Sequence, residues 1–149
     1  MYKRKRSSTW YRRVKRETEQ FVFDQIPITT PDGLAYIESL IAEKTSFNLL
    51  LTDFSRLGAA NYKELIRRIM RQLMTDSVAK LYSVHGHKGK TSFSKTTCFR
   101  AVIGAVQIHN RNVTSKDVEL VMGQWLAKAS ERLKKTSLEE TNRNGNDLE

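Results

Sequence analysis

Acidic residues are missing from the middle of this 149-residue sequence. From residue 77 to residue 116 there is no Asp or Glu, while the same window contains seven Lys or Arg. The surfaces of globular proteins usually mix charges of both signs. A surface of one sign is typical of proteins that bind polyanions, among which nucleic acid is the commonest partner.

Cysteine and long apolar runs are also scarce. Cys98 is the only cysteine, so an intrachain disulfide is excluded and a reducing compartment is favoured. No stretch approaches the ~18 apolar residues that a membrane span requires, so no membrane association is expected. The basic N-terminal residues are not followed by an apolar region, so a secretory signal is not expected either. The cytosol or the nucleus remains.

The positive charge is spread unevenly along the chain. The formal net charge is +10 and the isoelectric point is near 9.9. Residues 1–20 carry a net charge of +6, residues 21–135 carry +7 and residues 136–149 carry −3. The length favours one domain. We therefore expect a basic disordered arm over residues 1–20, a helical domain over 21–135 and a disordered polar tail over 136–149.

The basic residues of the N-terminal arm fall into two groups. They are Lys3, Arg4, Lys5 and Arg6, followed by Arg12, Arg13, Lys15 and Arg16. Two such groups resemble a two-part nuclear import signal, but they equally suit an arm that binds phosphates. Trp10 and Tyr11 lie between the groups and can stack on bases. An import signal, a nucleic-acid arm and a solvated tail all remain open.

Apolar residues at helical spacing dominate the domain. Residues 21–28, which include Pro27, predict an extended lead-in packed on the core. Five or six helices are then expected, beginning near Pro31, residue 46, Asn61, Asp76, Thr96 and Thr114, the last one continuing to about residue 133. Gly104 within one of these helices suggests close packing against a neighbour. The fold class is therefore expected to be all-α, in a single compact domain.

The spacing of the His, Cys and Asp residues gives little support to a catalytic or metal-binding site. His85, His87 and His109 do not combine with Cys98 in a metal-ligand pattern. Cys98 lies near the start of a helix, where a thiol can be acidified, but a buried packing role fits it better. Asp32, Asp53 and Asp76 could form a metal-binding acidic set like that of a transposase. Asp32 and Asp76, however, lie at expected helix starts, where capping already explains them. We expect no enzyme activity, no catalytic residues, no metal and no cofactor.

The basic residues of the second half are stronger candidates for a binding site. Residues 83–90 form a loop with two glycines, which lets the backbone approach a phosphate, and Lys88 and Lys90 supply charge. The next helix offers amide donors near its start. The other candidates are Lys95 and Arg100 in the acid-free window and Lys128, Arg132 and Lys135 on one face of the final helix.

The order of these features resembles a known family. Residues 65–79, the loop at 85–93 and the apolar helix that follows are similar to the BEN domain. The resemblance is closest to an uncharacterised BEN-related domain of insect and cnidarian chromatin and transposon-associated proteins. That pattern has an Ile-Pro-Ile entry like residues 26–28 and a Leu-Gly turn like residues 57–58. The resemblance covers about residues 21–135.

The resemblance implies an all-helical fold that binds double-stranded DNA in transcriptional repression or chromatin insulation, with self-association in some members. Lys88 and Lys90 match the family's basic loop, and Lys128, Arg132 and Lys135 match its final helix. The family places aromatic and arginine pairs near the end of the domain, whereas Trp125 of this sequence falls in the apolar stripe. This departure favours phosphate binding over base-specific recognition. Three hypotheses follow. They are a nuclear DNA-binding module, a helical adaptor whose basic face binds an acidic partner, a chromatin protein or a second copy of the chain, and a remnant of a transposase or nuclease.

Overall fold

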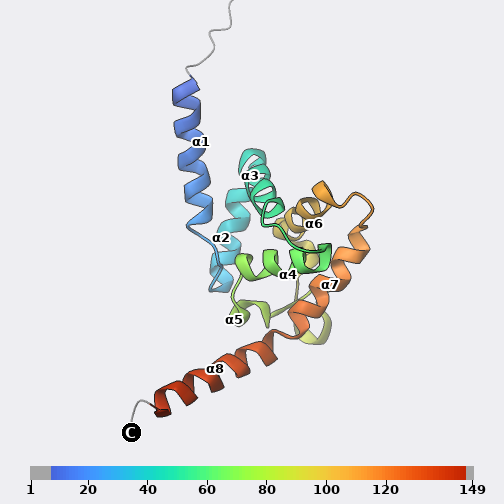
Figure 1. The fold of residues 1–149 in the computed structure, drawn as a ribbon. Coiled ribbons are helices and arrows are strands. Elements are labelled where there is room, and N and C mark those ends of the chain that lie inside the picture. Colours follow the sequence, from blue (N-terminus) through green and yellow to red (C-terminus); the bar gives the residue numbers. More distant parts are fainter. Residues whose placement is uncertain (1–7, 147–149) are drawn as a thin grey trace, which may run out of the picture.

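The computed structural model describes residues 8–146, which are almost entirely helical (Figure 1). The helices are α1 (Ser8–Phe23), α2 (Pro31–Ile41), α3 (Lys44–Ser55), α4 (Tyr62–Leu73), α5 (Asp76–Ala79), α6 (Thr97–His109), α7 (Ser115–Ala127) and α8 (Ala129–Asn146). Two short strands, β1 (Tyr82–Ser83) and β2 (Thr91–Ser92), and two 3₁₀ turns, η1 (His87–Gly89) and η2 (Phe93–Lys95), lie between α5 and α6. The expected all-α class is confirmed, with eight α-helices in the described residues.

Side-chain caps fix where the helices begin. The side chain of Thr30 accepts a hydrogen bond from the Gly33 amide at 3.0 Å, and Asn61 caps α4 in the same way. Thr114 and Asp117 form the reciprocal capping box that their spacing predicted. Each cap satisfies amide groups that have no partner inside the helix, so these short polar side chains define the boundaries.

The core is one continuous cluster to which each of the long helices between residues 31 and 127 contributes. α3 packs along α6, while α4 packs along α7 on the other side of the cluster. Gly104 of α6 lies against Leu51 of α3, since a Cβ added at Gly104 would stand 2.5 Å from Leu51 Cδ1. The close packing expected at this glycine is therefore present, and the helical domain is single and compact.

The lead-in to the domain is shorter than the sequence indicated. Residues 21–23 belong to the end of α1, and the chain becomes extended only over the segment that contains Pro27. Ile28 then pairs with Met74 in an isolated parallel bridge, donating its amide to the Leu73 carbonyl at 2.8 Å. This bridge ties the entry of the domain to the end of α4.

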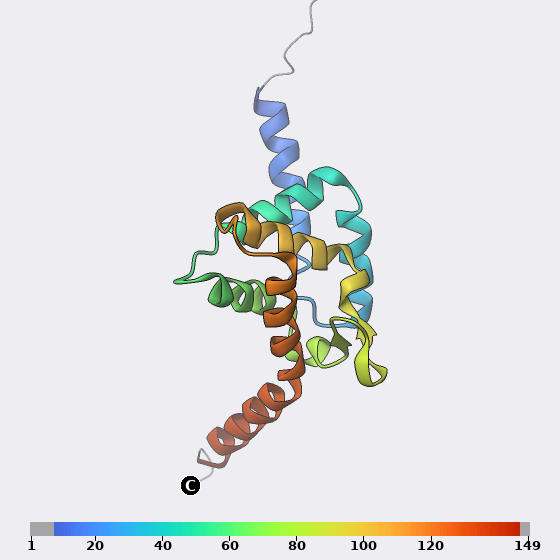
Figure 2. The ribbon, with the colours of Figure 1, turned by 90° about the vertical axis from the view of Figure 1, so that its right-hand side faces the viewer.

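Both ends of the described chain are helical where disorder was expected. α1 covers residues 8–23 of the predicted arm and lead-in, and α8 continues through the predicted tail to Asn146. Neither segment contains proline, and pairs four residues apart, such as Arg13 with Glu17 at 3.2 Å, support a helix. Residues 1–7 and 147–149 lie outside the described residues. Figures 1 and 2 show α1 and α8 projecting from opposite ends of the body.

The predicted final helix is divided at Lys128. The backbone there leaves the α-helical region, with φ −90° and ψ 1°, so α7 ends at Ala127 and α8 sets off in a new direction (Figure 1). Arg132 donates from Nη1 to the Trp125 carbonyl at 2.7 Å. In a continuous helix the Trp125 carbonyl would accept a hydrogen bond from the amide of residue 129. At the break, the Arg132 guanidinium donates to this carbonyl instead. None of the helices within residues 8–146 has both the length and the apolar character of a membrane span.

A carboxylate from α2 caps the start of α6. The Thr97 amide donates to Glu38 Oε1 at 2.6 Å, and the Cys98 amide donates to Oε2 at 3.0 Å. Thr96 adds a local cap by accepting from the Phe99 amide at 3.1 Å. The negative charge also opposes the positive end of the helix dipole. Glu38 therefore joins two helices that are about sixty residues apart in the chain.

We predict that Glu38→Ala lowers the free energy of unfolding by about 3 kcal/mol, because two hydrogen bonds to a charged group are lost. Glu38→Gln should recover part of this, since its amide oxygen accepts one of the two bonds. Urea denaturation followed by circular dichroism measures both. Glu140→Ala on the exposed face of α8 is the control and should behave as the unaltered protein. Equal stability of the two alanine variants would contradict the role given to Glu38.

Candidate nucleic-acid interface

The basic loop predicted over residues 83–90 is closed at its base by the two short strands. β1 and β2 are parallel, with Tyr82 opposite Thr91 and Ser83 opposite Ser92. Parallel strands normally need a long crossover, but here only residues 84–90 separate them. The chain returns this quickly because Gly86, Lys88 and Gly89 all adopt positive φ, at 77°, 56° and 74°.

Hydrogen bonds hold this loop in place. The Ser83 hydroxyl accepts from the His87 amide at 2.7 Å, and the Lys90 amide donates to the His87 carbonyl at 3.1 Å. At the base, the Ser92 hydroxyl donates to the Val84 carbonyl at 3.0 Å. These bonds therefore give the loop backbone, including that of Lys88 and Lys90, a defined conformation.

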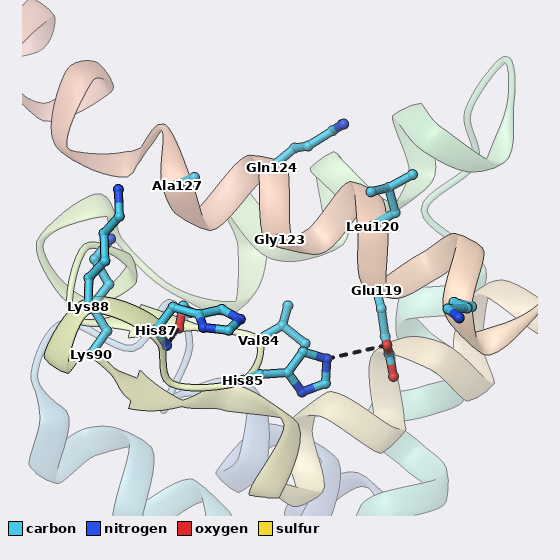
Figure 3. Close-up of a pocket in the computed structure, with 12 residues that line it drawn as sticks. Val84, His85, His87, Lys88, Lys90, Glu119, Leu120, Gly123, Gln124 and Ala127 are labelled. Carbon is cyan, nitrogen blue, oxygen red and sulfur yellow. Dashed lines mark hydrogen bonds and ion pairs between the residues drawn. The ribbon is translucent and has the colours of Figure 1, made fainter.

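A groove of about 600 Å³ separates the loop from α7. Figure 3 shows α7 along one side of the groove, the loop along the other, and Val84 pointing up between them. Gly123 of α7 faces this valine, since a Cβ added at Gly123 would lie 3.5 Å from a Val84 methyl group. The missing side chain at Gly123 therefore helps to keep the groove open.

Lysines dominate the charge of the groove. Lys88 and Lys90 line it from the loop and Lys116 lines it from the first turn of α7. None of these three lysines forms an ion pair within residues 8–146. Glu119 is the acidic residue in the lining, and its Oε2 lies 3.7 Å from His85 Nε2, as Figure 3 shows. The groove can therefore attract anionic groups.

Two of the predicted contacts lie away from this groove. Lys95 is exposed in η2 and Arg100 is exposed on α6, and neither lines the groove. Arg100 donates to the Thr97 hydroxyl at 3.3 Å and borders a separate hollow of about 200 Å³ beside α2 and α3. The acid-free window is continuous in sequence, but the fold spreads its basic residues over different faces.

Arg132, which was predicted to bind nucleic acid, is held by contacts within the protein. Its Nε and Nη2 both lie 2.9 Å from Asp76 Oδ1, and its guanidinium carbon lies 4.1 Å from the centre of the Trp125 ring. About 30% of its side chain is exposed. The spacing with Lys128 and Lys135 assumed one straight helix, but the break at Lys128 turns Arg132 inward. Lys128 and Lys135 remain exposed.

The amide donors predicted at the start of α6 are also committed to the fold. Glu38 accepts from the amides of Thr97 and Cys98, so its carboxylate occupies the place that a phosphate was expected to take. The sequence offered no signal for this contact, because Glu38 belongs to a helix about sixty residues earlier. The predicted phosphate contacts that remain are the lysine side chains and the loop.

The arm residues are only partly described. Arg12, Arg13 and Arg16 are exposed on α1, where Arg13 pairs with Glu17. The side chain of Lys15 and the group at residues 3–6 lie outside the described residues. In Figure 2, α1 leaves the top of the body while the loop lies near its lower edge. The two basic regions therefore face different parts of any ligand.

The residues considered for chemistry do not assemble. No group of three or more His, Cys, Asp or Glu side chains within residues 8–146 is placed to hold a metal ion. Cys98 is fully buried, and burial, reinforced by the nearby Glu38 carboxylate, raises the pKa of its thiol well above the ordinary value. The packing role predicted for Cys98 is confirmed. Asp76 is held by Arg132, and Asp32 lies in the first turn of α2.

Comparison with protein-family models, with curated proteins and with solved structures found no match to this chain. The geometry of the groove therefore carries the functional argument.

Several groove residues were missed by the sequence analysis. Lys116 is the last residue of the acid-free window, and no sequence pattern selected it, Leu120, Gly123 or Gln124 as site residues. A cap and a helical stripe identify α7, but nothing in the sequence indicates that its exposed side faces the loop. Leu120 could have indicated a binding surface on α7, because it is a large apolar residue outside the buried stripe of the helix. In the structure it is 65% exposed.

We predict that Arg132→Ala lowers the free energy of unfolding by about 2 kcal/mol, because it removes a partly buried ion pair and a cation–π contact. Lys128→Ala should change it by less than about 0.5 kcal/mol, as is usual for an exposed position. Thermal denaturation of both variants compares them directly. Similar stability of the two variants would place Arg132 among the free surface cations.

Cys98 gives a second prediction. Its burial and raised pKa keep the thiol protonated and inaccessible, so the native protein should react with a maleimide at least about 100-fold more slowly than the protein in urea. Mass spectrometry at intervals measures the labelled fraction. Rapid labelling of the native protein at neutral pH would mean that the start of α6 is open.

Proposed function

We propose that this protein is a nuclear DNA-binding module of BEN-like type that acts in chromatin or transcription regulation. It binds double-stranded DNA mainly through the phosphate backbone. Lys88 and Lys90 of the loop and Lys116 of α7 supply the phosphate contacts, and the exposed arginines of α1 add attraction elsewhere on the duplex. Lysines act as point charges on phosphates, so this set suits backbone binding rather than base-specific recognition.

The conformation of Lys88 carries the proposal. Its φ of 56° lies in the left-handed region, where a residue with a Cβ is less stable than glycine by roughly 1–2 kcal/mol. Backbone strain of this kind concentrates at binding sites. Gly86 and Gly89 stand on either side, yet the position between them that glycine would suit best holds a lysine. That lysine points its charge to the groove that Lys90 and Lys116 also line.

The wider charge distribution supports a polyanion as the ligand. The net charge of +10 raises the local concentration of any nucleic acid and speeds association. The basic groups at residues 3–6 and 12–16 suit import into the nucleus, where double-stranded DNA is the abundant polyanion. The resemblance to the BEN family, stated above on the sequence alone, supports the same assignment.

Fluorescence anisotropy of a labelled random duplex of about 25 base pairs tests the proposal. We predict sub-micromolar binding that weakens steeply with salt, with a slope of log K against log salt near −3 if three phosphates are neutralised. Lys88→Glu with Lys90→Glu should weaken binding at least about tenfold and reduce the slope by about two.

A matched control separates this surface from the overall charge. Lys44→Glu with Arg56→Glu changes the net charge by the same amount at two exposed residues at the ends of α3. This control should lose little affinity. Equal losses in the two double variants would contradict the assignment to the loop, and absent binding at about 50 mM salt by protein that is folded by circular dichroism would contradict DNA binding itself.

A further inference from the structure

Phosphate binding does not explain the apolar part of the groove. Leu120, Gly123 and Ala127 line it from α7 and Val84 lines it from the loop. The Leu120 side chain is 65% exposed although it borders a concave surface. Ala127 is exposed as well, whereas Gly123 is half-buried and Val84 is buried. Apolar surface in a groove rimmed by charge marks a site for a partner with apolar groups of its own.

The groove has the dimensions of a helix-binding site. It follows α7 from Lys116 to Ala127, and eleven helical steps of 1.5 Å give a length of about 16 Å. Figure 3 places Lys88 and Lys90 toward the Ala127 end, while Lys116 belongs to the first turn of α7 at the other end. A lysine therefore stands at each end of an apolar channel about three helical turns long. Glu119, one turn after Lys116, is the acidic residue of the lining and lies 3.7 Å from His85.

We propose that this groove binds an acidic amphipathic helix from a protein partner. Leu or Phe side chains of the partner would contact Leu120 and the gap at Gly123, while its carboxylates face the lysines at the two ends. Recognition of one helix face by an apolar groove with complementary charge is a recurrent binding mode. This proposal goes beyond DNA binding and does not depend on it.

Two other occupants fit the groove less well. A second copy of this chain would bring another net charge of +10 to a basic surface, which opposes self-association. An unstacked base would require a flat aromatic platform, whereas Val84, Leu120 and Ala127 are aliphatic and the two imidazole rings in the lining, His85 and His87, lie at 76° to each other. The charge of the rim and the chemistry of the floor together favour an acidic peptide.

The shared lysines connect the two sites. Lys88, Lys90 and Lys116 border the channel and are also the proposed phosphate contacts, so an acidic helix and DNA would compete for them. A bound partner would then release the protein from DNA at this surface. The apolar residues belong to the peptide site alone, which allows the two interactions to be separated by substitution.

The experiment uses the full chain and three labelled synthetic peptides of about 15 residues. A helix of that length has about four turns and spans about 22 Å, which is longer than the groove. The first peptide has Leu at every third or fourth position and Glu elsewhere. The second has the same composition with Leu scrambled around the helix, and in the third Ser replaces Leu. Anisotropy at about 150 mM salt measures binding, since this screens attraction beyond roughly 8 Å.

We expect the first peptide to bind at least tenfold more tightly than the other two. Leu120→Ser should weaken this binding at least tenfold and leave duplex binding unchanged. Leu138→Ser is the matched control, because Leu138 is also 65% exposed but lies on α8 outside the groove. Lys88→Glu with Lys90→Glu should weaken the peptide and the duplex together. Circular dichroism verifies that each variant is folded.

Other results would overturn the proposal. Equal binding of the three peptides would reduce it to general attraction of negative charge, and a response to Leu138→Ser equal to that of Leu120→Ser would move the site. Loss of duplex rather than peptide binding in Leu120→Ser would assign the floor to a base. A dimer in sedimentation that Leu120→Ser dissociates would assign it to a second copy. Loss of DNA binding alone would leave the peptide site standing and overturn only the proposed function.

Discussion

The contact between the Glu38 carboxylate and the start of α6 is the constraint on which the arrangement of this domain depends. α6 begins beside the fully buried Cys98, where a backbone amide left without a partner costs free energy. An acid from α2 satisfies two of them and balances the positive end of the helix. With that end fixed, α6 can pack along α3 through the gap at Gly104, and η2 and the loop before it are held in place. The same carboxylate contributes to the high pKa of the Cys98 thiol.

The fold divides the basic residues into two populations. One population has a carboxylate partner within the protein: Arg132 pairs with Asp76, and three arginines of α4 share the single carboxylate of Glu64 at 3.4–3.6 Å. The other, which includes Lys88, Lys90 and Lys116, has no carboxylate partner in the described part of the chain. Net charge counts both populations alike, but the second can bind an outside anion without giving up a carboxylate partner. Within the described residues, carboxylates from two helices contact the acid-free window: Glu38 of α2 accepts from the amides at the start of α6, and Glu119 of α7 lies near His85. Neither contact involves a lysine of the window.

Local sequence patterns predicted the helices better than the contacts between them. Thr30, Asn61 and Thr114 each announce a helix through a cap that depends on three neighbouring residues, and the structure has all three helices. Disorder over residues 8–20 and 136–146 was inferred from composition, whereas pairs such as Arg13 with Glu17 support helices there. The inward turn of Arg132 and the capping of α6 by Glu38 depend on contacts more than fifty residues apart, which no local pattern encodes. For the candidate site, Lys88 and Lys90 were found because they share one loop. Lys116 and Leu120 join them only through the packing of α7 beside that loop.

The closure of the loop by β1 and β2 has a consequence for how such a protein can diversify. Backbone hydrogen bonds at Thr91 and Ser94, together with the parallel pairing, hold the base of the loop whatever side chains residues 85–90 carry. His85, His87, Lys88 and Gly89 contribute nothing to the buried core. Related chains can therefore exchange these residues freely, provided that the left-handed positions are respected, and change what one wall of the groove accepts while the helices beneath stay the same. The domain is in this sense a constant frame that carries a short variable segment.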